Sequence, residues 1–134
     1  LKSVNKDDEL ITRIDIESTD KRIIYQKISA ATAKQKPSGI FVSSSRVFRV
    51  AEFLVDHKQH KDIYLIGYDL IDNNIKFLEE GVVDILISQK PIDQGYKSVI
   101  SLFNHMILHK EVNTTQHLPI DIIIKENIKY YINN

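Results

Sequence analysis

The segment DIYLIGYDLIDNN, residues 62–74, decides the fold that the sequence predicts. Five of the six residues from Ile63 to Tyr68 are apolar or aromatic, which is typical of a buried strand. The run stops at a carboxylate, Asp69, and a short helix is expected to begin at Asp72. An acid at the end of a buried strand indicates a ligand site only where other polar groups meet it.

Strands and helices alternate along the whole chain. Strands are expected at 9–17, 39–43, 63–68, 82–88 and 119–128, and helices at 20–35, 45–59, 72–80 and 91–110, followed by a short helical tail. This alternation predicts an α/β fold, a three-layer sandwich with a mostly parallel sheet of about four to five strands and helices on both faces. A length of 134 residues suits one such domain.

Polar residues follow three of the predicted strands. They are residues 43–46, Asp69 and residues 88–90. The C-terminal ends of parallel strands lie at one edge of a sheet, where ligands bind, so these residues are expected to converge. Their hydroxyl, carboxylate and amide groups suit a polyhydroxylated ligand. A purely structural role stays open, because Asp and Ser also cap helices and form turns.

Composition and charge exclude several classes of protein. Eighteen basic residues balance eighteen acidic ones, so the chain lacks the basic footprint of a nucleic-acid-binding module. There is no cysteine, which excludes disulfides and thiolate metal sites. No apolar run approaches the roughly 20 residues of a membrane span. The first residues, LKSVNKDDEL, lack an initiator methionine and a signal-peptide core, which predicts a fragment of a larger protein.

Histidine spacing and sequence motifs give little support for a metal site or an enzyme. His105 and His109 have a spacing at which two imidazoles can share one ion, but no HExxH pattern accompanies them. The sequence contains no GxGxxG, P-loop or GxSxG motif. A phosphoryl-acceptor receiver domain is an alternative, with Asp69 supported by Glu17 and Lys90, although the acidic pair that a receiver needs is missing. We therefore predict no metal, no cofactor and no catalytic residue.

Four segments carry a resemblance to a known family: GIFVSSSRVFRVAEFLV, DIYLIGYD, GVVDILISQKPIDQGYKSVISL and LPIDIIIKENIKYYI. In this order they resemble the C-terminal half of the effector-binding core of lac-repressor-family (LacI-type) transcription regulators. The resemblance covers residues 9–134, and its most specific part is the glycine-tyrosine-aspartate at 67–69 followed by ISQKPIDQGY. It implies the fold of the periplasmic sugar-binding proteins and a protein that is not an enzyme.

The resemblance also implies ligand-binding residues. Asp69 matches the acid that accepts hydrogen bonds from sugar hydroxyls, and Gln89 matches the amide that reaches the ligand. A carboxylate accepts strong charge-assisted bonds, and an amide both donates and accepts. Relatives usually carry an asparagine-aspartate pair where this chain has Ser44 and Ser45. That departure indicates a larger ligand, a water-mediated contact or a charged effector partnered by Arg46.

For the whole protein, the resemblance implies a two-lobed core. Residues 9–118 would form the C-terminal lobe, and residues 119–134 a crossover strand and tail that return to a first lobe. A small-molecule effector, a sugar, would control the binding of operator DNA by an N-terminal helix-turn-helix domain. We expect a cytoplasmic homodimer with no membrane association. A periplasmic sugar-binding protein of a transporter is the alternative, which a signal peptide in place of the helix-turn-helix domain would reveal.

Two apolar segments carry packing predictions. An apolar stripe on the helix at 91–110 is expected to lie mostly in the core; it consists of Tyr96, Val99, Ile100, Phe103, Met106 and Ile107. The strand at 119–128 is nearly continuous in apolarity, which indicates burial on both faces. Without a partner, this strand would expose an unpaired edge that promotes aggregation. Residues 120–124 are therefore predicted to join their own sheet or to pair with another copy.

Overall fold

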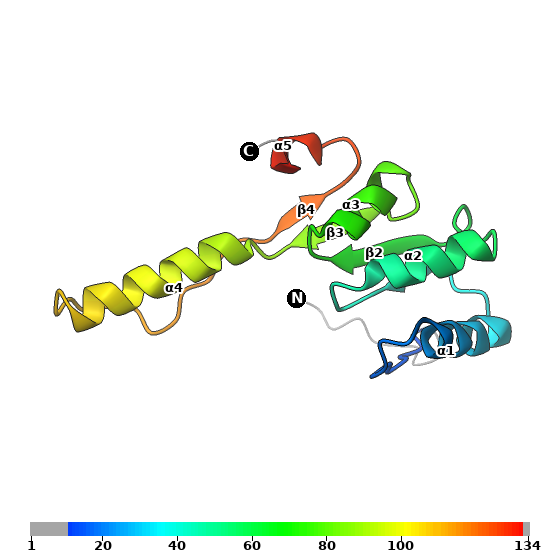
Figure 1. Ribbon diagram of the computed structural model, residues 1–134, viewed down its shortest axis with the longest axis horizontal. Helices are drawn as coiled ribbons and strands as arrows, with labels where there is room; N and C mark the ends of the chain where they lie inside the picture. The colour runs from blue at the N-terminus through cyan, green and yellow to red at the C-terminus, as the bar shows by residue number, and fades with distance from the viewer. Residues whose placement is uncertain (1–10, 133–134) are drawn as a thin grey trace, which may run out of the picture. The chain divides into compact units, whose positions relative to one another are not determined.

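The computed structural model describes residues 11–132 and divides the chain into two compact units, Leu1–Ser38 and Gly39–Asn134 (Figure 1). The first unit holds α1 (Lys21–Lys34), whose amino end is capped by Asp20 as the sequence predicts. The predicted strand is wrong over residues 11–17, which are irregular, and residues 9 and 10 lie outside the described residues. Apolar alternation gives a strand only where a neighbouring strand pairs with its backbone.

The second unit is built around a four-stranded sheet in the order β1-β2-β3-β4. Strands β1 (Gly39–Phe41), β2 (Tyr64–Tyr68) and β3 (Ile85–Ser88) are parallel, and β4 (Asp121–Ile123) pairs antiparallel with β3. The helices of this unit are α2 (Val47–Asp56), α3 (Asp72–Glu79), α4 (Pro91–Met106) and α5 (Lys129–Ile132). The predicted α/β class with a mostly parallel sheet is therefore confirmed.

Helices α2 and α3 pack against one face of the sheet. On this face Leu65 of β2 and Leu86 of β3 are fully buried. Gly67 of β2, which pairs with Leu86, lies directly against Val47 of α2. An added Cβ at Gly67 would overlap the valine side chain. The absence of a side chain at Gly67 therefore sets how closely α2 approaches the sheet.

The opposite face of the sheet is apolar and partly exposed. Tyr64 is 70% exposed, Phe41 is 57% exposed and Ile122 is 51% exposed. They occupy the strand positions that alternate with the buried ones, as the pleat requires. Near the carboxyl ends of β1 and β2, the rings of Phe41 and Tyr68 meet edge to face with centroids 5.6 Å apart. The core of this unit therefore lies between the sheet and α2 and α3.

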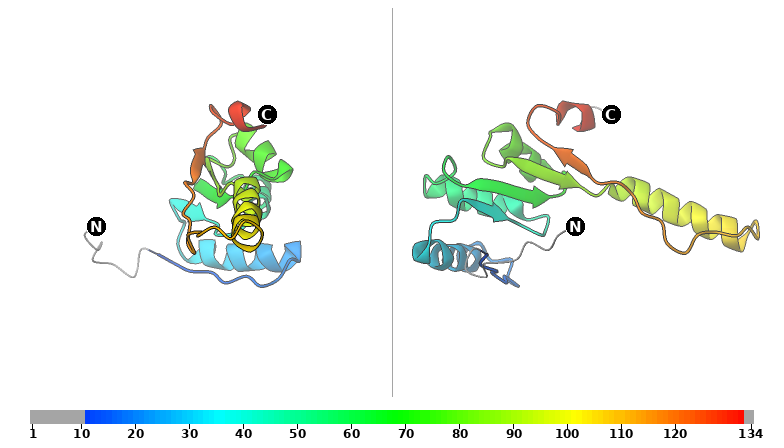
Figure 2. Two further views of the ribbon diagram at one scale, coloured as in Figure 1. Left: turned by 90° about the vertical axis from the view of Figure 1, so that its left-hand side faces the viewer. Right: turned by 180° about the vertical axis from the view of Figure 1, so that it is seen from behind.

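Helix α4 does not fill the core, so the predicted core position of its apolar stripe is wrong. None of its residues is buried, and it runs away from the sheet with residues 107–120 returning beside it (Figures 1 and 2). A helix that covers a sheet must first turn back across it. Only Gln89 and Lys90 separate β3 from α4, and the helix continues outward from the strand end.

The C-terminal strand joins its own sheet, which confirms the prediction for residues 120–124. In β4, Ile123 pairs with Leu86 and Asp121 pairs with Ser88. The expected burial on both faces is wrong: Ile123 is buried on the face of α2 and α3, whereas Ile122 lies on the exposed face. Continuous apolarity indicated burial on both faces, but β4 is an edge strand with one covered face.

We predict that Gly67→Ala lowers the free energy of unfolding by about 1–3 kcal/mol, because the added methyl group overpacks the contact with Val47. Urea denaturation of the purified chain measures this loss. Gly95→Ala is the matched control, since nothing lies within 4 Å of the position that its Cβ would take. Alanine favours the helix by about 0.5–1 kcal/mol over glycine, so the control should be neutral or stabilising. Equal losses in the two variants would contradict the tight packing at Gly67.

Candidate functional site

The carboxyl ends of the three parallel strands lie at one edge of the sheet and carry all five predicted ligand-binding residues. Ser44, Ser45 and Arg46 lie between β1 and α2, Asp69 follows β2, and Gln89 follows β3. The backbone N–H of Asp69 donates to the carbonyl oxygen of the last but one residue of β3, Ile87, at 3.0 Å. The three loops thus begin from adjacent, hydrogen-bonded strands.

A buried asparagine of α3, Asn74, connects two of these loops. Its Nδ2 lies 3.0 Å from the carbonyl oxygens of Ser45, Tyr68 and Asp69. Its Oδ1 accepts a hydrogen bond from the backbone N–H of Phe48 at 3.1 Å. Asn74 is completely excluded from solvent, so its polar groups depend on these partners. The sequence pattern did not predict a role for Asn74, whose position in the first turn of α3 was its one local signal.

The backbone of Asp69 is held in place while its carboxylate is unpaired. Its φ of 71° lies in the left-handed region, which aspartate tolerates better than most residues. Within residues 11–132 no hydrogen bond or ion pair of its carboxylate is present, and the residue is half-buried. Such backbone strain clusters at functional sites. The carboxylate is therefore available to accept hydrogen bonds from a ligand.

The loop after β1 presents a hydroxyl and a guanidinium. The Oγ of Ser44 accepts the backbone N–H of Arg46 at 3.4 Å, and both residues are exposed. Ser45 is half-buried, and its carbonyl is the one bound by Asn74. Ser44 and Arg46 are thus the members of this loop that can reach a ligand.

The loop after β3 is fixed through its backbone and through Lys90. The carbonyl of Gln89 accepts from the side chain of Gln94 at 2.6 Å, and the Oγ of buried Ser88 accepts the N–H of Lys90 at 3.4 Å. The Nζ of Lys90 lies 3.0 Å from Asp121 Oδ2. This hydrogen bond raises the pKa of Lys90 above its ordinary value, although partial burial opposes the shift. The exposed Gln89 side chain remains accessible, whereas the Lys90 amine is engaged.

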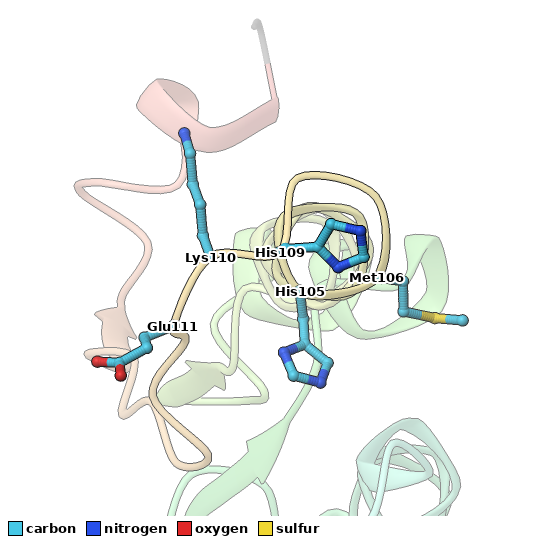
Figure 3. A pocket seen from close by; sticks show the side chains of 5 residues that line it. All are labelled: His105, Met106, His109, Lys110 and Glu111. Carbon is cyan, nitrogen blue, oxygen red and sulfur yellow. The ribbon is translucent and has the colours of Figure 1, made fainter.

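The two histidines near the end of α4 are not arranged as a metal site. An open hollow of about 480 Å³ is lined there by His105, Met106, His109, Lys110 and Glu111. Figure 3 shows the two imidazoles pointing in different directions, with Glu111 apart from both. His109 lies beyond the end of α4 with a φ of 48°, so the expected helical spacing is lost. Among residues 11–132 no group of three potential ligands could hold a metal ion.

A solved structure from Bacteroides fragilis resembles this chain in sequence as well as in fold. That protein, described as a LacI transcriptional regulator, has 35% sequence identity and a TM-score of 0.72 over 87% of this chain. The chain resembles the LacI type. The resemblance to this family that the sequence predicts is thereby confirmed, and with it the periplasmic-binding-protein-like fold.

Sugar-binding proteins share the same fold. A glucose-galactose binding protein from Geobacillus stearothermophilus has a TM-score of 0.72 at 20% identity over 82% of this chain. A periplasmic solute binding protein from Actinobacillus succinogenes with bound D-allose has a TM-score of 0.74 at 17% identity over 84% of the chain. The chain spans only 39–40% of the length of these three proteins.

Neither a family model nor a curated protein sequence matches this chain. No helix within residues 11–132 is long and apolar enough to cross a membrane.

We predict that Asn74→Ala destabilises the chain by about 1–3 kcal/mol, because a buried N–H and three carbonyl oxygens lose their partner. Urea denaturation measures the loss, and NMR should show the largest backbone shifts at Ser45, Phe48 and Asp69. Asn73→Ala is the matched control, since Asn73 is exposed and its replacement should change stability by about 0.5 kcal/mol or less. A similar loss in both variants would mean that Asn74 does not connect the loops.

Proposed function

We propose that this chain is the C-terminal lobe of the effector-binding core of a LacI-type transcription regulator, with residues 9–118 as the lobe proper. It binds a sugar or a related small polar molecule and has no catalytic role. The observation that carries the proposal is the unpaired, half-buried carboxylate of Asp69, fixed at the same sheet edge as Gln89. The 35% identity with the B. fragilis protein supports the LacI-type assignment.

The proposed chemistry is hydrogen bonding to hydroxyl groups. The Asp69 carboxylate accepts from two hydroxyls in charge-assisted bonds, which are stronger than bonds between neutral groups. The Gln89 amide donates to one ligand oxygen and accepts from another hydroxyl. Ser44 adds a short hydroxyl, and the exposed Arg46 adds a positive charge beside it. This set favours a polyhydroxylated ligand and also accommodates an acidic one.

In the whole protein, we propose that the effector controls operator binding by an N-terminal helix-turn-helix domain in a cytoplasmic homodimer. A periplasmic sugar-binding protein is the second candidate, supported by the similar fold of the proteins that bind glucose, galactose and D-allose. The regulator is favoured because the B. fragilis protein has the higher sequence identity. A helix-turn-helix domain in the N-terminal sequence of the intact protein would indicate the regulator, and a signal peptide the transport protein.

We predict that Asp69→Asn weakens sugar binding by the intact protein about tenfold or more, because an ionised partner contributes about 1.5–3 kcal/mol to a hydrogen bond. Asparagine also tolerates a left-handed backbone, so the substitution removes the charge without adding strain. Isothermal titration calorimetry with D-glucose, D-galactose, D-allose, D-tagatose, D-fucose and D-arabinose would identify the ligand and then compare the variants.

The matched control is Asp72→Asn, which removes an exposed carboxylate in the first turn of α3. It should leave the dissociation constant unchanged. An unchanged affinity in Asp69→Asn, for a sugar that the unmodified protein binds, would refute the assignment of Asp69. Binding of none of the six sugars would refute a site for simple neutral sugars.

A further inference from the structure

Two neighbouring segments connect the sheet to α4. The chain leaves β3 through Gln89 and Lys90, and it re-enters the sheet at Asp121, the first residue of β4. Since Asp121 pairs with Ser88 in the antiparallel ladder, the outgoing and returning segments lie side by side. We call α4 and the returning residues 107–120 the arm (Figure 2).

Within residues 11–132 the arm is joined to the sheet only at its base. No residue of α4 is buried, and its large apolar side chains are exposed along its length. Apart from the bonds of Gln94 to the carbonyls of Gln89 and Lys90 at its base, the described hydrogen bonds of the arm are internal, such as that from Gln116 Nε2 to Ser101 Oγ at 3.3 Å. The direction of the arm relative to the sheet therefore depends on the geometry of the two connecting segments.

One ion pair joins these segments. The Nζ of Lys90 and the Oδ2 of Asp121 are 3.0 Å apart, and the two side chains are only 28% and 24% exposed. Lys90 also has a left-handed backbone, φ 53° and ψ 59°, and its carbonyl accepts the N–H of Gln94 in the first turn of α4. A left-handed non-glycine residue persists only where its surroundings fix it. The ion pair is a tertiary contact that can do so.

We propose that Lys90 and Asp121 form a clasp that sets the direction of the arm relative to the ligand-binding edge of the sheet. Gln89 precedes Lys90 directly, so a change at the clasp also changes the position of Gln89. The two clasp residues are thus positioning residues: they act on the ligand through Gln89 and on the arm through the backbone of Lys90. The effect on the ligand rests on the proposed function, whereas the effect on the arm does not.

The arm's direction can be measured without any ligand. The chain has no cysteine, so nitroxide labels can be placed at Glu79→Cys in α3 and Lys97→Cys in α4, both of which are exposed. Double electron–electron resonance then gives the distribution of distances between the label on α3, which packs on the sheet, and the label on the arm. We expect Lys90→Met and Asp121→Asn each to broaden this distribution. The charge exchange, Lys90→Asp with Asp121→Lys, should narrow it again, because aspartate tolerates the left-handed backbone.

Arg49→Met is the matched control. It removes the Arg49–Glu52 pair, which has side chains 34% and 27% exposed and a separation of 3.1 Å, but which lies within α2. The control should leave the distance distribution unchanged. An equal width in the unmodified chain and the two clasp variants would overturn the proposal, as would a charge exchange that leaves the distribution as broad as in the single variants.

Calorimetry with the sugar found for the intact protein separates this proposal from the proposed function. A partly exposed ion pair stabilises its local geometry by up to about 1 kcal/mol. If the whole of this free energy supports ligand binding, Lys90→Met should raise the dissociation constant by up to about fivefold. A broadened distance distribution with none of the six sugars bound by the unmodified protein would support the clasp and refute the site for simple neutral sugars. An unchanged distribution with normal sugar binding would refute the clasp and leave the function standing.

Discussion

The hydrogen bonds of the Asn74 amide are the interaction on which the geometry of the proposed ligand-binding edge depends. Carbonyl oxygens of two loops and of the end of β2, with an N–H of the first turn of α2, converge on a single buried side chain. Because the amide has no contact with water, its hydrogen bonds cannot be exchanged for solvent ones when the loops move. The backbone at Ser45 and at Asp69 is consequently held in one arrangement, and the side chains of the ligand edge extend from a fixed support.

Much of the framework of this edge could be predicted from the sequence. The apolar run that stops at Asp69 placed β2, and the helical spacing of Val47, Val50, Ala51 and Leu54 placed α2. Both signals are local, because each depends on the period of one element. The position of Asp69, Gln89 and Ser44 at one edge followed from the general geometry of parallel sheets.

The remaining features could not be predicted because they depend on residues far apart in the chain. Asn74 reaches Phe48 and Ser45, which are 26 and 29 positions away, and its sequence context is that of a solvated first turn. The stripe on α4 shows that the helix is amphipathic, but periodicity does not reveal which surface lies opposite. For residues 11–17, alternation provided no information about a partner strand. In each case the local sequence carries no information about the residues that lie opposite.

The left-handed backbone of Asp69 limits how this site can diversify. Only glycine, asparagine and aspartate adopt such a φ at low cost, so the second strand end can present a carboxylate, an amide or no side chain at all. The loop that carries Ser44 has no residue with a positive φ and is open to many more side chains. Over evolution, a change of effector would therefore be accommodated first at the end of β1, while the end of β2 keeps one of three chemistries.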